Sequence, residues 1–308
     1  MRPDAKNVDR LAMIAVEEAL HALRNAVPLR EGMFAKSDAL LEWIERNLSL
    51  SNRAKLRSIE FKPTRRRIRL GRDNFLVELS GIQRESYEAY ETVGEVTYAV
   101  ELHIDGTNVR VVSFEVHFIN TTPEGEIGDS SERPFRLPFD VSWTWDGDKA
   151  AKYSADYAMS PNSAYRTYDV DCTNFASQCL TAGGKTEIGS VIDRKKDEVW
   201  FYGSFEITTS YTWAAAQNLF QHLTNYTDTT TEADHLSLRP GDLIIMEPKP
   251  GHEWHAMIVT ERTDDDALMS YHTNNTLRRS FIQILNNSIA AKQFWYLRIG
   301  TSYKANVV

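Results

Sequence analysis

The sequence has few cysteines and no long apolar run. Only two of its 308 residues are cysteine, Cys172 and Cys179. If both lie on one helix, their spacing separates them by about 10 Å along the axis, whereas a disulfide needs Cα atoms within about 7 Å. The two thiols are therefore expected to stay free. The sequence also lacks the run of about 18 apolar residues that a membrane-spanning helix needs, so no membrane span is expected.

Basic charge is scarce as well. The chain has 35 Lys and Arg against 43 Asp and Glu, a formal net charge of −8. Nucleic-acid binding needs a basic surface, and the one dense basic run, residues 65–69, is typical of a solvated strand face. No nucleic-acid partner is expected. Residues 1–10 contain no apolar signal-peptide core, which indicates either a cytoplasmic protein or an exported one whose leader has been removed.

The composition is that of a globular protein with room for two domains. Apolar residues make up 42% and charged residues 25%, as in soluble domains, and 308 residues exceed one ordinary core. Between residues 120 and 138 the periodic pattern stops and Thr, Gly, Ser, Glu and Pro dominate. We therefore expect a domain boundary at about residue 140, with one domain over residues 1–140 and another over 141–308.

The N-terminal half predicts helices followed by an antiparallel sheet. Apolar residues recur at helical spacing over residues 8–23, and a second helix is expected to begin with Ser37 as its N-cap. Residues 98–104 and 112–118 alternate apolar and polar side chains around a Gly-containing turn, which predicts a β-hairpin. This half is expected to be an α+β domain whose order of elements is similar to NTF2-like or cystatin-like folds.

The C-terminal half also predicts an α+β domain, with helices packed on a small antiparallel sheet. One helix ends before Pro161, because proline disfavours helix at the preceding residue, and another ends at Gly183–Gly184. The expected helices cover about residues 148–159, 172–183 and 213–223, and the expected strands cover residues 243–246, 255–261, 268–273 and 294–299.

Cys172 is the candidate nucleophile of this half. Asp171 is a good N-cap, so Cys172 is expected in the first helical turn, where the helix dipole and free N–H groups favour a thiolate. The same N–H groups could hold the oxyanion of a tetrahedral intermediate. The alternative is a packing role, because Cys172, Phe175 and Cys179 share one helical face. Cys179 is expected to be a core residue.

Two of the eight histidines are candidates for the base that a cysteine nucleophile needs. His255 begins the expected strand 255–261 and His272 ends the expected strand 268–273. The turn between these strands would make the two residues neighbours across the hairpin. His255 would then be the base, and His272, or Asn274 beyond it, would orient the imidazole.

The residues around Cys172 resemble the signature of the bacterial putative amidase domain family. The run Asp-Cys-Thr-Asn-Phe-Ala-Ser-Gln-Cys-Leu-Thr-Ala-Gly-Gly over residues 171–184 carries the resemblance, and it covers about residues 146–300. The further matching segments, in the same order as in the family, are Ser210–Leu219, Gly241–Ile244, His255–Thr260 and His272–Asn274.

The resemblance implies a papain-like fold, similar to NlpC-type and CHAP cell-wall peptidases, for the C-terminal half. It implies Cys172 as nucleophile, His255 as base and His272 as third residue, with Asn274 as the alternate. It further implies a peptide or amide substrate such as peptidoglycan, and no cofactor. Trp254 stands where the family often has Asp, a departure that leaves the reacting groups in place.

A set of residues near these segments is expected to contact the substrate. For the aromatic members, ordinary packing is the alternative. The set is Asp171, Tyr165, Tyr168, Trp213 and Trp254.

Three other interpretations stay open. Cys172, His252, His255 and His272 could form a zinc site, although their spacing matches no zinc signature. The domain could be an inactive binding module. Acyl transfer would use the same nucleophile and base, and only the competing nucleophile would distinguish it from hydrolysis.

Overall fold

The computed structural model describes residues 5–27, 29, 32–71, 74–105, 108–118, 141–250, 252–288 and 290–304. The chain forms two compact units. One comprises Met1–Ile119 with Ile282–Ser288, and the other comprises Asn120–Phe281 with Ile289–Val308. Residue 140, where the domain boundary was expected, lies outside the described residues.

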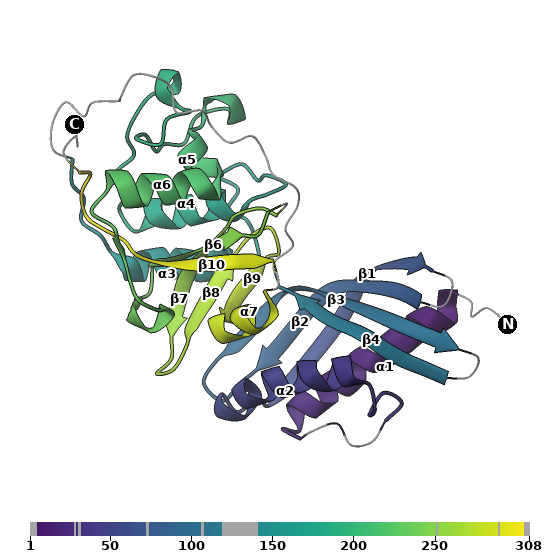
Figure 1. Cartoon of the computed structure of the whole chain (residues 1–308). Helices are drawn as coiled ribbons and strands as arrows, with labels where there is room; N and C mark the ends of the chain where they lie inside the picture. Colours follow the sequence, from purple (N-terminus) through teal and green to yellow (C-terminus); the bar gives the residue numbers. More distant parts are fainter. Residues whose placement is uncertain are drawn as a thin grey trace. The chain divides into compact units, whose positions relative to one another are not determined.

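The first unit is a four-stranded antiparallel sheet with two helices on one face (Figure 1). Its strands are hydrogen-bonded in the order β1-β2-β3-β4. This α+β arrangement confirms the predicted helices and the predicted hairpin. The elements are α1 (Ala5–Arg24), α2 (Asp38–Arg53), β1 (Ser58–Leu70), β2 (Asn74–Ser86), β3 (Glu91–Asp105) and β4 (Asn108–His117).

Period-two alternation explains how this sheet meets its helices. Phe75, Val77 and Leu79 of β2 are fully buried, and the residues between them are more exposed. They share one core with Tyr98 of β3 and Trp43 of α2. One face of the sheet is therefore apolar and covered by helix, while the other carries the polar side chains.

A segment from late in the sequence belongs to this first unit. Helix α7 (Phe281–Asn287) was not predicted, and amide side chains fix it in place. Asn287 accepts a hydrogen bond from Trp43 Nε1 at 2.8 Å and donates to Asn47 Oδ1 at 3.1 Å. Gln283 donates to the buried Glu85 at 2.8 Å. The first unit therefore uses residues on both sides of the expected boundary.

The second unit is also α+β, with an antiparallel sheet in the order β9-β8-β7-β6-β10-β5. Helices α3 and α4 pack on β7, and α6 packs on β6 (Figure 1). The elements are α3 (Gly147–Tyr157), α4 (Cys172–Ala182), α5 (Tyr211–Ala214), α6 (Ala216–Tyr226), β5 (Thr230–Thr231), β6 (Leu243–Pro248), β7 (His255–Arg262), β8 (Ala267–Tyr271), β9 (Thr276–Ser280) and β10 (Ala291–Arg298).

Three differences from the predicted elements matter. The third helix is broken at Ala215, whose backbone is extended, so Trp213 lies in the short α5. The strand predicted over residues 268–273 ends at Tyr271, which leaves His272 and Thr273 in a turn. Strand β9 was not predicted. None of the described helices has the length and apolar composition that crossing a bilayer requires.

The role of α7 in the first unit can be tested with Asn287→Ala. The change leaves the buried Trp43 N–H and Asn47 without their partner, which should lower the free energy of unfolding by about 1–3 kcal/mol. Urea unfolding measures the effect. The neighbouring Asn286→Ala is the control, because its amide bonds only an exposed carbonyl and should cost less than about 0.5 kcal/mol. Equal losses in the two variants would contradict the assigned role.

Candidate active site at the start of helix α4

Cys172 is the first residue of α4, as predicted. Asp171 occupies the N-cap position, and its carbonyl oxygen accepts the Phe175 N–H at 2.9 Å. The helix ends at Ala182 with Gly183 as its C-cap, and Gly184 follows with a φ of +98°, the left-handed conformation that glycine tolerates. Both cysteines are free thiols. Cys172 is only 1% exposed, so its chemistry is that of a desolvated group.

The Asp171 side chain does not cap the helix, which corrects one expectation. Its Oδ1 accepts hydrogen bonds from Tyr168 N at 3.0 Å and from Asn174 Nδ2 at 2.8 Å. Its Oδ2 contacts His272 Nδ1 at 2.6 Å. Both carboxylate oxygens are thus engaged inside the protein, so Asp171 organises the site and does not point toward a substrate in this structure.

Thr273 provides the cap in place of Asp171. Its Oγ1 accepts hydrogen bonds from the Asp171 N–H at 3.0 Å and from the Cys172 N–H at 3.2 Å. Thr273 lies in the turn after β8 and has a φ of +80°, an uncommon conformation for a β-branched residue. Sequence reasoning missed Thr273, because only the folded turn brings its hydroxyl to the helix.

His272 is held by two acceptors. Nδ1 contacts Asp171 at 2.6 Å and Nε2 contacts the Tyr157 carbonyl at 2.9 Å, while the ring stacks on Phe175 with centroids 4.0 Å apart. A carbonyl can only accept, so Nε2 must carry a proton toward Tyr157. With both nitrogens engaged elsewhere, His272 makes no hydrogen bond to His255 in this structure. The expected orienting contact is not formed.

Asn274, the alternate third residue, is buried in the same turn. Its backbone oxygen accepts a hydrogen bond from the Thr276 hydroxyl at 2.6 Å. This bond closes the turn that carries His272 and Thr273. Asn274 therefore contributes to the shape of the turn through its backbone.

His255 is the first residue of β7 and is 3% exposed. Its ring meets that of Tyr271 edge to face at 5.0 Å, and its Nε2 is buried without a hydrogen-bond partner. Burial lowers the pKa of His255 to about 3, because a charged imidazolium is costly in an apolar environment. The imidazole is neutral at neutral pH and has a nitrogen free to accept a proton.

Cys172 approaches β7 at the residue after His255. Burial raises the pKa of the Cys172 thiol, and hydrogen bonds from the Ala256 N–H and from the Thr173 and Thr273 hydroxyls oppose that rise. The Thr173 hydroxyl lies 3.7 Å from Sγ. These hydrogen bonds favour the thiolate, whereas burial and the negative charge of Asp171 disfavour it.

The alternation of side chains along β7 separates Cys172 from His255. Ala256 and Ile258 share a core with Phe175 of α4, so His255 points to the opposite face of the strand. Among the described residues, no hydrogen bond joins the Cys172 thiol to either imidazole. The sequence placed Cys172 at the start of a helix and His255 at the start of a strand, as the structure has them. It could not set which face of β7 His255 occupies.

The aromatic candidates differ in exposure. Trp213 is fully buried, and its Nε1 donates to Asn174 Oδ1 at 2.8 Å. These contacts favour a packing role for Trp213 and not a role as a wall of a substrate cleft. Trp254 is half-buried against Phe220, with centroids 5.6 Å apart. The remaining candidates, Tyr165 and Tyr168, are also half-buried.

Two residues that sequence reasoning missed fix the segment before α4. Asn174 donates to the Arg166 carbonyl at 2.8 Å as well as to Asp171. The Arg166 guanidinium bonds the Gly203 carbonyl at 2.7 Å and lies 4.4 Å over the Tyr202 ring. Asn174 lies one turn after Asp171 on the helix, and this spacing could have predicted their hydrogen bond. Arg166 gave no such signal, because its partners are distant in the sequence.

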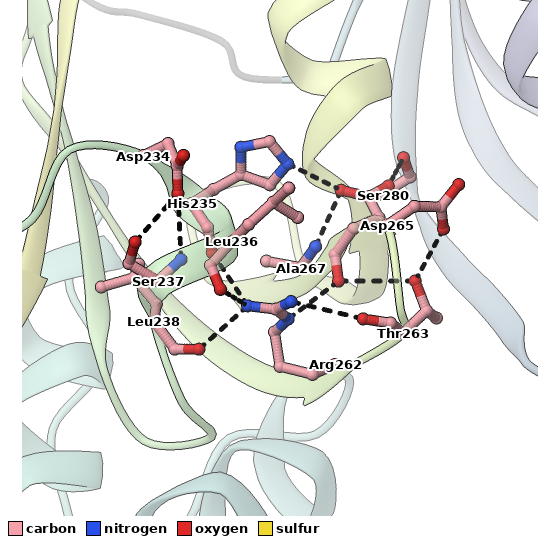
Figure 2. A network of polar contacts seen from close by, with 11 residues as sticks. Asp234, His235, Leu236, Ser237, Leu238, Arg262, Thr263, Asp265, Ala267 and Ser280 are labelled. Atoms are coloured by element: carbon pink, nitrogen blue, oxygen red, sulfur yellow. Dashed lines mark hydrogen bonds and ion pairs between the residues drawn. The ribbon is translucent and has the colours of Figure 1, made fainter.

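A dense polar cluster at the other end of β7 has a structural role (Figure 2). Arg262, the last residue of β7, donates to three carbonyl oxygens of the loop over residues 235–238. Asp266 accepts from the Ala267 N–H at 2.8 Å and from the Ser280 hydroxyl. Because these bonds join backbone groups of neighbouring segments, the cluster fixes the β7–β8 hairpin that carries the candidate site.

The alternative zinc site is not assembled. Across the described ranges, no three His, Cys, Asp or Glu side chains converge as metal ligands would. The side chains of Cys172, His255 and His272 contact different partners, which are Thr173, Tyr271 and Asp171 respectively.

Comparison with known proteins identifies the family. The sequence profile described as the putative amidase domain matches residues 144–297, half of the chain. The chain therefore belongs to this family, and amide hydrolysis is the class of activity that the match supports. No solved structure matches the chain.

Two curated relatives come from Bacillus subtilis strain 168. Uncharacterized protein YhbB is 31% identical over 90 residues, which are 29% of this chain and 27% of YhbB. Uncharacterized protein YjcM is 30% identical over 135 residues, which are 43% of this chain and 32% of YjcM. The matches thus span about a third or less of each relative.

The buried, neutral His255 predicts a pH dependence of stability. Between pH 6.5 and about 3, the unfolded chain binds a proton at His255 that the folded chain does not. The free energy of unfolding should therefore fall as pH is lowered through this window, by about 1.4 kcal/mol per pH unit from this residue alone.

His255→Asn should remove that contribution, as urea unfolding at several pH values between 6.5 and 4.5 can measure. His252→Asn, three residues earlier and half-buried, is the control and should keep the wild-type slope. Parallel slopes for wild type and His255→Asn would show that His255 is not held neutral by burial.

Proposed function

We propose that residues 141–308 hydrolyse an amide bond with Cys172 as the nucleophile and His255 as its base. The observation that carries the proposal is a buried thiol at the first residue of a helix, with the Thr173 hydroxyl 3.7 Å from its sulfur. Such a position favours a reactive thiolate through the helix dipole and direct donors. Membership of the amidase family supports the same chemistry.

His255 is the better base because it has a free nitrogen. His272 has both ring nitrogens bonded to Asp171 and the Tyr157 carbonyl, whereas His255 Nε2 has no partner. His255 lies on the other face of β7, so proton transfer requires its ring to turn toward Cys172.

The reaction then follows from these groups. His255 takes the thiol proton, and the Cys172 sulfur adds to the amide carbonyl carbon. The oxyanion replaces the Thr273 hydroxyl as acceptor of the Cys172 N–H. The C–N bond breaks as the imidazolium protonates the leaving amine, and water hydrolyses the thioester to release the acid and the free thiol.

A papain-like fold and a peptide substrate are part of this proposal. A helix that begins with cysteine and packs on an antiparallel strand that begins with histidine is the order expected of papain-like enzymes. Peptidoglycan or another peptide is the proposed substrate class, as expected from the family resemblance. His272, with Asn274 as its alternate, is proposed to support the site from the turn after β8.

The test measures release of amines from peptidoglycan fragments and from a peptide-amide library. Cys172→Ser should reduce hydrolysis at least about 1,000-fold, and His255→Asn at least about 100-fold. Cys179→Ser is the matched control, because Cys179 is equally buried but lies mid-helix in the apolar core, and it should retain activity.

Alkylation by iodoacetamide gives a readout that needs no substrate. Cys172 should react at least about tenfold faster than Cys179, because Cys172 lies at the start of the helix and burial raises the pKa of Cys179 further. Equal rates, together with no hydrolysis, would favour the inactive binding module. Loss of activity in His272→Asn but not in His255→Asn would reassign the base.

A further inference from the structure

We infer that Thr273 is the positioning residue of Cys172, acting through its hydroxyl on the start of the helix that carries the thiol. The inference deepens the proposed function and rests on it. Its basis is the pair of hydrogen bonds that Thr273 Oγ1 accepts from the backbone N–H groups of Asp171 and Cys172, at 3.0 and 3.2 Å.

The first N–H groups of a helix have no partner within the helix, and a side-chain oxygen at the N-cap usually supplies one. Here the N-cap residue Asp171 uses its carboxylate for Tyr168, Asn174 and His272. Thr273, about a hundred residues away in sequence, takes over the role. The start of α4 is therefore tied to the turn after β8.

The conformation of Thr273 indicates that this contact is maintained against strain. A φ of +80° costs a β-branched residue on the order of 1–3 kcal/mol. Neighbouring bonds hold the turn in place. His272 is anchored to Asp171 and to the Tyr157 carbonyl, and the Thr276 hydroxyl bonds the Asn274 carbonyl. His272 thus fixes the backbone that presents the Thr273 hydroxyl.

The chemistry of a hydroxyl explains why threonine suits this place. Its oxygen accepts the two N–H bonds, and its own proton remains available to donate. The Thr273 hydroxyl is one of the groups that bond the Cys172 sulfur. One side chain thereby aligns the helix start and stabilises the thiolate.

The test compares three variants of Thr273 with a variant of the same turn. Thr273→Val keeps the branched shape and removes the hydroxyl, Thr273→Ser keeps the hydroxyl, and Thr273→Ala repeats the removal without β-branching if the valine variant fails to fold. Thr276→Val is the matched control, because its hydroxyl bonds the Asn274 carbonyl and not α4. The rate of alkylation of Cys172 by iodoacetamide is measured from pH 5 to 10 by mass spectrometry in roughly half-unit steps.

Thr273→Val and Thr273→Ala should raise the apparent pKa of Cys172 by about one unit and slow its alkylation at pH 7 about tenfold. Thr273→Ser should keep the wild-type profile, and Thr276→Val should lower stability without moving the pKa of Cys172. A purely structural role would make the Thr273 and Thr276 variants alike, which would overturn the inference.

The two proposals fail separately in this experiment. If Cys172 is activated in the wild type and the Thr273 variants leave its pKa unchanged, only the role of Thr273 is wrong. If removing the hydroxyl shifts the pKa of Cys172 while the wild type hydrolyses no amide, the role of Thr273 is supported and the hydrolase proposal is overturned.

Discussion

The hydrogen bond between Asp171 and His272 is the contact on which the site depends. It joins two side chains that are almost fully buried, at 2.6 Å, and such a pair is stable only when its remaining groups are also bonded. The Tyr157 carbonyl and the Asn174 amide meet that condition. Because the bond occupies the Asp171 carboxylate, the helix start is left for Thr273 to cap. These hydrogen bonds thereby join the start of α4 to the turn after β8.

Burial sets the resting state of the two groups that the proposed reaction uses. Desolvation penalises both the thiolate and the imidazolium, so it raises the pKa of Cys172 and lowers that of His255. Both effects favour the neutral pair, in which the proton stays on sulfur. Hydrogen bonds to the Cys172 sulfur oppose the rise in the pKa of the thiol, whereas no described residue opposes the fall in the pKa of His255. A substrate that admits water or supplies charge would therefore shift this balance toward the ion pair.

The sequence predicted the elements of the site better than its contacts. Helix capping and alternation placed Cys172 at a helix start and His255 at a strand start, because both signals are local. Which face His255 occupies depends on strand register, where a shift of one residue reverses every side chain. The strand expected over residues 268–273 ends at Tyr271, so His272 lies in the following turn and contacts Asp171 and Tyr157. Helix α7 was missed because its amides find their partners about 200 residues earlier in the sequence.

Trp254 directly precedes His255, whose burial lowers its pKa to about 3. The family often has an aspartate at this position, and a carboxylate beside an imidazole favours the charged form. Here the residue is a half-buried tryptophan that packs on Phe220. Desolvation alone accounts for the lowered pKa of His255, with no charged neighbour acting against it. A tryptophan at this position supplies no charge that would offset the burial of the imidazole, so in the proposed reaction the imidazolium would depend on other groups for its stabilisation.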